Sequence, residues 1–192
     1  MQKNANPHRL KLLLIMAVFA LPVVASYLAY FVWKPQGATR NYGTLIQPIS
    51  LADTLTIRAL DGTPLPLKAL RGKWLLVQVD ASPCAGDCEK KLYAMRQVRL
   101  MQGRERDRVE RLWVIADGRT PRKNLQQAYE GFQLVTDPGR ALIEKLAAES
   151  DASQFIYMID PLGNVMMSWP ANPDIKRMHK DIERLLKASQ IG

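Results

Sequence analysis

The feature that most constrains this chain of 192 residues is an uncharged, apolar run of 22 residues, Leu12 to Trp33. In an α-helix, at about 1.5 Å per residue, the run is roughly 33 Å long, enough to cross a hydrocarbon layer of about 30 Å. Tyr27, Tyr30 and Trp33 gather at its C-terminal end, where aromatic side chains favour the membrane interface. We therefore predict a tail over residues 1–11 and a transmembrane helix over residues 12–33.

A cleaved signal peptide is the alternative for this segment, with Val23-Val24-Ala25 as an imperfect cleavage site. Signal peptides have apolar cores of about 7–15 residues, and this run continues well beyond Ala25, which favours an uncleaved anchor. Basic residues are more numerous before the run than after it, where Lys34 and Arg40 follow. This asymmetry predicts a cytoplasmic N-terminus and a translocated C-terminal domain. We expect a single-pass protein of a bacterial inner membrane, with its domain in the periplasm.

The net charge of +9 at pH 7 does not indicate a nucleic-acid-binding protein. Five basic residues and no acidic residue lie within residues 1–52, so this segment carries +5. The other 140 residues carry 22 basic and 18 acidic side chains, a net charge of only +4. A nucleic-acid-binding domain concentrates positive charge on its folded part. We therefore expect the membrane, and no nucleic acid, among the partners.

Apolar runs and helical patterns alternate along the rest of the chain. Residues 34–52 are predicted to form a tether and residues 53–192 a single folded domain. Strands are expected in a hairpin over 54–67 and then over 74–79, 112–116, 132–135, 155–159 and 165–168. Helices are expected over 84–102, 121–130 (with Thr120 as N-cap) and 141–149, and after Pro173. This order predicts an α/β domain with a central, mostly parallel sheet, helices on both faces and an N-terminal β-hairpin.

The two cysteines of the chain, Cys84 and Cys88, lie where a buried strand is predicted to end and a helix to begin. In a helix, a spacing of four residues places both sulfurs on one face, one turn apart. The first turn favours the thiolate of Cys84, although Asp87 and Glu89 oppose this effect. The pair can be a redox-active dithiol, two ligands for Cu(I), or inert buried thiols. A translocated domain favours the first two roles, because that compartment oxidises thiols.

Several motifs together resemble the Sco (SenC) family over about residues 50–190. The matching residues are Gly72-Lys73-Trp74, Cys84-x3-Cys88, Asp117-Gly118-Arg119-Thr120-Pro121 and the segment Ile156-Tyr157-Met158-Ile159-Asp160-Pro161-Leu162-Gly163. The family consists of membrane-anchored, thioredoxin-like copper chaperones for the binuclear copper site of cytochrome c oxidase. The resemblance therefore implies a thioredoxin-like fold, copper as a ligand and a role in oxidase assembly.

The sequence departs from this family at the third copper ligand. The family uses its two cysteines and a histidine, in an Asp-His-Ser that lies five residues before the strand tyrosine. Here that stretch is Asp151-Ala152-Ser153, so Ala152 replaces the histidine. The two histidines present are His8, on the expected cytoplasmic side, and His179, which we expect to be exposed or partly packed on the last helix. Two thiolates can hold Cu(I) linearly, whereas Cu(II) would lack its nitrogen ligand.

Other residues that could contribute to a site are better explained by packing or solvation. Thioether ligands for copper could come from four methionines, Met158, Met166, Met167 and Met178. Met158 and Met178 lie in apolar patterns, so core packing explains them better. Met166 and Met167 are adjacent in a predicted strand, so at most one of them can face the cysteines. The alternating charges of residues 104–111 predict a solvated helix end and loop. Asp117 is expected either to orient the cysteine site or to cap the turn before Pro121.

The leading hypothesis is a Sco-like thiol–disulfide reductase that acts in assembly of the copper site of cytochrome c oxidase. Cys84 would be the attacking thiol, and Cys88 would resolve the mixed disulfide. The expected partner is the copper-site subunit of the oxidase, or another periplasmic copper or thiol protein. The alternatives are a Cu(I) carrier that borrows a ligand from its partner, and a non-catalytic tethered scaffold. No cofactor is expected apart from Cu(I) in the carrier hypothesis.

Overall fold

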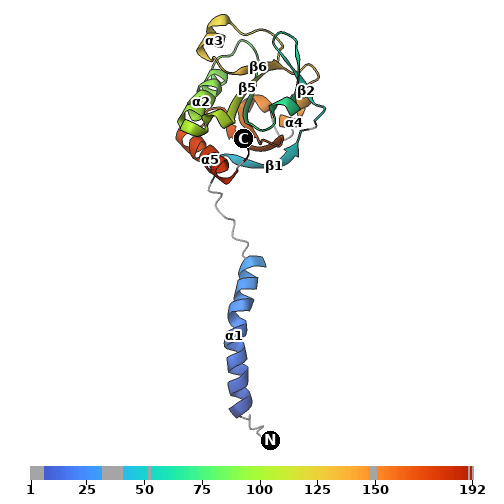
Figure 1. The fold of residues 1–192 in the computed structure, drawn as a ribbon. Helices are drawn as coiled ribbons and strands as arrows, with labels where there is room; N and C mark the ends of the chain where they lie inside the picture. Colours follow the sequence, from blue (N-terminus) through green and yellow to red (C-terminus); the bar gives the residue numbers. More distant parts are fainter. Residues whose placement is uncertain (1–6, 32–40, 52, 148–150, 190, 192) are drawn as a thin grey trace. The chain divides into compact units, whose positions relative to one another are not determined.

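The computed structural model describes residues 7–31, 41–51, 53–147, 151–189 and 191. The chain divides into two compact units, Met1–Arg40 and Asn41–Gly192, and each is considered by itself. The first unit contains helix α1 (Pro7–Phe31), which is the one described helix that is long and apolar enough to cross a membrane. The second unit contains a sheet and all the other helices of the described residues (Figure 1).

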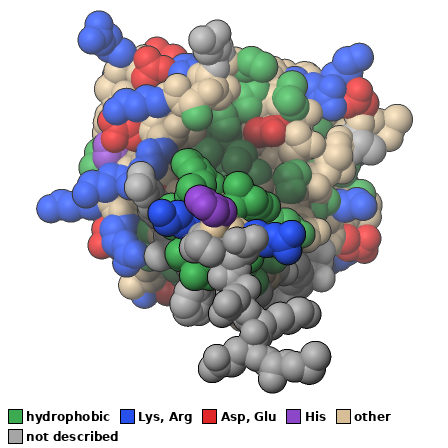
Figure 2. Space-filling model, turned by 90° about the horizontal axis from the view of Figure 1, so that it is seen from below, with side chains coloured by type: hydrophobic (Ala, Val, Ile, Leu, Met, Phe, Trp, Pro, Cys, Tyr) green, Lys and Arg blue, Asp and Glu red, His purple; other side chains and the backbone are tan. Residues whose placement is uncertain are grey.

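Helix α1 has the properties of a single membrane anchor. Pro22 lies inside the helix without ending it, and the large apolar side chains along the helix are exposed. Figure 2 views this helix from its N-terminal end, where basic and histidine side chains lie in front of hydrophobic ones. The helix includes the predicted span from Leu12 as far as Phe31, but it begins at Pro7, within the predicted tail; Trp33 lies outside the described residues.

The second unit is built on an eight-stranded sheet with the strand order β1-β8-β7-β4-β5-β6-β2-β3. Its strands are β1 (Thr44–Ser50), β2 (Thr56–Ala59), β3 (Pro64–Pro66), β4 (Trp74–Asp80), β5 (Val109–Ile115), β6 (Gln133–Thr136), β7 (Phe155–Ile159) and β8 (Asn164–Pro170). Within the described residues, only β4–β5 and β5–β6 pair in parallel. The sheet is therefore mixed, and not mostly parallel as predicted, because β2–β3 and β7–β8 are antiparallel hairpins that extend it on both sides.

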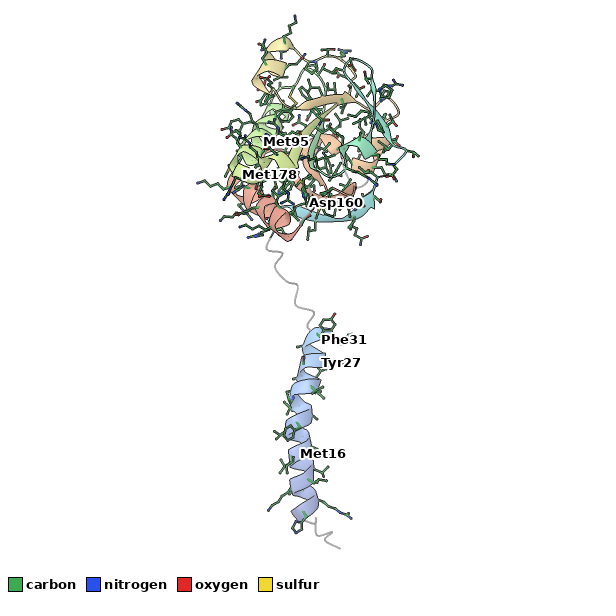
Figure 3. The ribbon with its side chains drawn as sticks, viewed as in Figure 1. Met16, Tyr27, Phe31, Met95, Asp160 and Met178 are labelled. Carbon is green, nitrogen blue, oxygen red and sulfur yellow. A yellow bond between two sulfur atoms is a disulfide. The ribbon has the colours of Figure 1, made fainter. Side chains whose placement is uncertain are left out.

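Helices cover both faces of this sheet, as predicted. They are α2 (Asp87–Met101), α3 (Lys123–Ala128), α4 (Ala141–Leu146), α5 (Ile175–Ala188) and the short 3₁₀ helices η1 (Leu67–Leu70), η2 (Gly103–Arg108) and η3 (Ala152–Gln154). On one face α2 packs against α5, with Met95 and Met178 between them (Figure 3). On the other face, α4 and η1 cover a core that includes Leu75, Val77 and Val79 of β4.

Strand β4 lies at the centre because its residues are apolar on both faces. Leu75, Val77 and Val79 contribute to one core, while Trp74 and Leu76 contribute to the core beneath α2 and α5. A continuous apolar run is the pattern of a strand that is covered on both sides. Met158 and Met178, for which core packing was favoured, are fully buried in the core under α2 and α5. Met167 is also fully buried there, and Met166 is partly buried.

Strand β1 lies within the segment that the sequence analysis assigned to the tether, residues 34–52. It forms the sheet edge by pairing with β8, and its register shifts between Leu45 and Ile49, around Pro48. Proline is tolerated at edge strands and bulges because it lacks a donor for the sheet. Most side chains of β1 are exposed, so the strand has no strong alternation of polar and apolar residues for a sequence pattern to reveal.

Two other expectations for local structure differ from the structure. The helix predicted over 121–130 is α3, which begins at Lys123, after Arg122 in an extended conformation, rather than at Pro121. Residues 104–107 of the charged run 104–111 are exposed, but Arg111 is buried on β5 and stacks over the Phe132 ring at 4.4 Å. Burial and the nearby Arg99 lower the pKa of Arg111 to about 10. Arg111 therefore belongs to the folded core and not to a solvated loop.

Candidate functional site

A disulfide bond joins Cys84 and Cys88, and their Cα atoms lie 5.3 Å apart. Cys88 is in the first turn of α2, but Cys84 lies in the loop before it, so the prediction that the helix carries both cysteines is wrong. Gly86 ends the loop with a φ of 59° and a ψ of −116°, which is outside the helical region and is a conformation open to glycine. The sulfurs therefore meet across a turn, and Cys84 lacks the predicted position inside the helix.

The disulfide lies just beneath an exposed loop. Cys84 is 3% exposed and Cys88 is 6% exposed, and both pack against a small apolar cluster that includes Trp113 of β5. Pro83 and Ala85, on either side of Cys84, are exposed. Because thiol–disulfide exchange requires access to a sulfur, a partner must displace or open this loop to reach Cys84.

Gln78 of the central strand β4 contacts the disulfide at Cys88. Its side chain is fully buried, and its amide Nε2 donates a hydrogen bond to Cys88 Sγ at 3.5 Å. Its Oε1 has no hydrogen-bond partner among the described residues. The central strand thus directs a polar group at Cys88, beside the apolar cluster that contains both cysteines.

Asp117 holds the loop that carries Cys84. Its carboxylate accepts hydrogen bonds from the Ser82 backbone N at 3.0 Å and the Ser82 Oγ at 2.8 Å, and also from the Arg119 backbone N at 3.3 Å. Burial by itself would raise the pKa of Asp117, but the hydrogen bonds from Ser82 and Arg119 outweigh it and the pKa is lowered. Asp117 therefore closes its own turn and also fixes the loop two residues before Cys84, so both expected roles apply.

Lys91 is a residue of this region that the sequence analysis missed. Its side chain is 0% exposed, its Nζ lies 2.7 Å from Asp80 Oδ2, and it donates to the Ser153 carbonyl. Burial raises the pKa of Asp80, and the hydrogen bond and charge of Lys91 counteract part of that rise. One signal was present: Lys91 lies three residues after Cys88 and four before Met95, within the apolar stripe of α2.

The structure brings no histidine to the two sulfurs within its described residues. Ala152 is buried at the start of η3, where Asp151 accepts a hydrogen bond from the Ser153 backbone N. His179 is partly buried on α5, and its Nδ1 lies 3.0 Å from Gln102 Nε2, at the far end of α2 from Cys88. His8 lies on α1, in the other unit.

The residues around the disulfide offer few ligands to a metal ion. Within the described ranges, no three His, Cys, Asp or Glu residues gather in a way that could hold one. The buried methionines belong to the core under α2 and α5, while the cysteines belong to a separate cluster. Reduction would free two thiolates, which fit a linear Cu(I) ion but not the mixed sulfur and nitrogen set that suits Cu(II).

The sheet, its flanking helices and a disulfide at the junction of the central strand and α2 define a thioredoxin-like protein with a redox-capable cysteine pair. A family model described as "Transmembrane-like, thioredoxin-like, C-terminal domain" matches residues 74–189. The chain belongs to this family. No curated protein matches its sequence.

Solved structures of Sco proteins have the same fold. A SCO1/SenC family lipoprotein from Bacillus anthracis is 21% identical, with 74% of this chain and 99% of that chain covered and a TM-score of 0.55. Yeast Sco1 with copper bound is 20% identical, with 73% and 95% covered and a TM-score of 0.57. BsSco, a member of the Sco family of cytochrome c oxidase assembly proteins with a disulfide switch, is 16% identical, with 78% and 97% covered and a TM-score of 0.54. The resemblance to Sco proteins is thus confirmed for the fold.

Proposed function

We propose that this protein is a membrane-anchored thiol–disulfide reductase of the Sco type, which acts in assembly of the copper site of cytochrome c oxidase. The observation that carries the proposal is the Cys84–Cys88 disulfide at the end of the central strand. The description of BsSco as an oxidase assembly protein with a disulfide switch supports the same chemistry. The substrate would be a disulfide in the copper-site subunit or in another periplasmic copper or thiol protein.

The reaction consumes one disulfide and produces another. In the reduced protein, the Cys84 thiolate attacks a sulfur of the substrate disulfide, and the second substrate sulfur leaves as a thiolate that takes up a proton. The Cys88 thiolate then attacks Cys84 Sγ in the mixed disulfide, which releases the other substrate thiol. The substrate gains two electrons and two protons, and the protein ends with the Cys84–Cys88 disulfide. An external dithiol reductant must then restore the protein.

We place the domain in the periplasm and the tail, residues 1–11, in the cytoplasm. The apolar helix α1 and the excess of basic residues before it support an inner-membrane anchor with this orientation. The disulfide is in keeping with an oxidising compartment. On this proposal residues 12–33 span the membrane, and the domain begins before the predicted boundary at residue 53, because β1 is part of its sheet.

A Cu(I) carrier is the second candidate, because yeast Sco1 has been solved with copper bound. In this chain copper would be a cargo held by Cys84 and Cys88 after reduction, with a further ligand from the partner protein. Among the described residues, no His, Asp or Glu joins the two sulfurs in a group that could hold a metal ion, so this candidate depends more on its partner than the reductase does. A tethered scaffold without chemistry is the remaining possibility.

The test of the reductase uses the reduced full-length protein in detergent and an oxidised peptide that carries a cysteine pair of the copper-site type. We expect stoichiometric release of peptide thiols with formation of the Cys84–Cys88 disulfide. Cys88→Ser should accumulate a mixed disulfide through Cys84, whereas Cys84→Ser should not. Failure of the wild-type protein to reduce the peptide, together with tight competitive binding of one Cu(I), would replace the reductase with the carrier.

A further inference from the structure

The buried charge of Lys91 has no part in the exchange reaction. Lysine is almost never fully buried unless it is paired, and here the ammonium is held by the Asp80 carboxylate of β4 and the Ser153 carbonyl of η3. Lys91 therefore joins three elements, α2, β4 and η3, at one point. Its neighbour Lys90 has the usual arrangement, an exposed side chain paired with the exposed Asp87.

This ion pair lies next to the disulfide. Gln78 and Asp80 alternate along β4 and face the same side of the sheet, and Cys88 and Lys91 are three residues apart on the facing helix α2. Gln78 contacts Cys88, and Asp80 contacts Lys91. These are neighbouring contacts between the same two elements, because helix positions three apart have Cβ atoms roughly 5–6 Å from each other.

Without Lys91, this arrangement would attract a cation. Among the described residues Asp80 is not grouped with the cysteines as a metal ligand. Without its ammonium partner, however, its carboxylate would place an uncompensated negative charge on the side of β4 that faces Cys88. An uncompensated negative charge in a partly buried position raises the affinity of a nearby site for a cation by about tenfold to a hundredfold. The ammonium of Lys91 fills the position between the two oxygens and cancels the charge of Asp80.

We propose that Lys91 is a specificity-determining residue, whose ammonium neutralises Asp80 and keeps the reduced Cys84–Cys88 pair from capturing a metal cation. Lys91 thereby holds the pair available for disulfide exchange. This inference rests on the proposed function, in which the reduced pair is a dithiol reagent.

Cu(I) is the probe for this proposal. The reduced full-length protein in detergent is titrated anaerobically with Cu(I) against a competing chelator, together with Lys91→Met, Asp80→Asn, the double variant Asp80→Asn/Lys91→Met and the exposed control Lys90→Met. We expect Lys91→Met to bind Cu(I) at least tenfold more tightly than the wild type, because Asp80 becomes uncompensated. Asp80→Asn should bind more weakly, and the double variant and Lys90→Met should lie within about threefold of the wild type.

Equal Cu(I) affinity in Lys91→Met and the wild type would overturn the proposal, as would a double variant as tight as Lys91→Met. If circular dichroism shows that Lys91→Met does not fold, the comparison of Asp80→Asn with the wild type decides. In Asp80→Asn the ammonium of Lys91 has lost its carboxylate partner and should repel Cu(I), so an affinity equal to that of the wild type would contradict the proposal. Peptide reduction is measured on the same samples. A wild type that reduces no peptide contradicts the proposed function, whereas the ratio of Cu(I) affinities alone decides the role of Lys91.

Discussion

At the scale of single residues, Asp117 is the side chain that ties the cysteine loop to the sheet. Its carboxylate accepts two hydrogen bonds from Ser82, and both come from a loop that is otherwise exposed on either side of Cys84. Charged acceptors make stronger hydrogen bonds than neutral ones, by about a factor of two. The position of Cys84 is therefore set largely by a residue 33 positions later in the chain.

Asp117→Asn should loosen this loop. We expect the domain to lose about 1 kcal/mol of unfolding free energy, because the charged acceptor becomes a neutral one, and the disulfide to be reduced severalfold faster by a small thiol. The matched control is Asp61→Asn, which alters an exposed turn whose carboxylate accepts a hydrogen bond from the Thr63 backbone N. A reduction rate in Asp117→Asn no higher than in Asp61→Asn would contradict this account.

Acid should loosen the cysteine loop in the same way as Asp117→Asn, because it neutralises the Asp117 carboxylate. The pKa of Asp117 is lowered in the folded protein, so the ionised carboxylate favours folding. Its contribution is complete above the pKa of the unfolded chain, about 3.9, and is lost as the pH falls through the lower, folded value. We expect the rate of disulfide reduction by a phosphine, which needs no thiolate, to rise below about pH 4 in the wild type but not in Asp117→Asn.

At the scale of elements, the start of the domain is locked to its last helix. Asp181 of α5 accepts hydrogen bonds from the Tyr42 and Gly43 backbone N atoms and from Trp169 Nε1. Gly43 packs directly against the Trp169 ring, so an added Cβ would lie 2.5 Å from Nε1. This contact explains why β1 follows immediately as part of the sheet and not of the tether.

Gly43→Ala should therefore destabilise the domain. The added methyl group must displace a fully buried tryptophan or the edge strand, and such overpacking costs about 1–3 kcal/mol. The matched control is Gly139→Ala, where an added Cβ meets nothing within 4 Å. Chemical denaturation followed by tryptophan fluorescence measures both, and equal midpoints would refute the packing argument.

At the scale of the whole molecule, the sheet and all three buried clusters lie within residues 41–192. Nothing in these clusters comes from α1, whose apolar side chains are exposed. Anchoring and folding are therefore separate properties of two units of one chain. The stability of the domain derives from its own sheet and not from the anchor.

A chain that begins at Asn41 should fold without the membrane helix. We expect its thermal midpoint to agree with that of the full-length protein in detergent within a few degrees, because the truncated chain keeps the whole sheet and its buried clusters. A further truncation to residue 53 removes β1 and should lower the midpoint much more. Calorimetry of the three chains decides this, and equal midpoints for the two truncations would show that β1 adds nothing to stability.

Sequence patterns alone determined the elements with strong local signals. The apolar length of α1, the run of β4, the hairpin at Asp61-Gly62 and the stripe of α5 each depend on neighbouring residues, and the structure agrees with them. The cysteine pair was evident for the same reason. Local spacing failed at Cys84, because Gly86 is in a non-helical conformation and the helix begins only after it, at Asp87.

Only the tertiary structure decided the properties that depend on distant contacts. The addition of β1 to β8, the antiparallel pairing that makes the sheet mixed, and the burial of Arg111 each need partners far along the chain. The same holds for Lys91, which resembles any surface lysine until α2 packs on β4 and η3. The ammonium of Lys91 is buried against an opposite charge, and that partner, Asp80, is supplied by the fold.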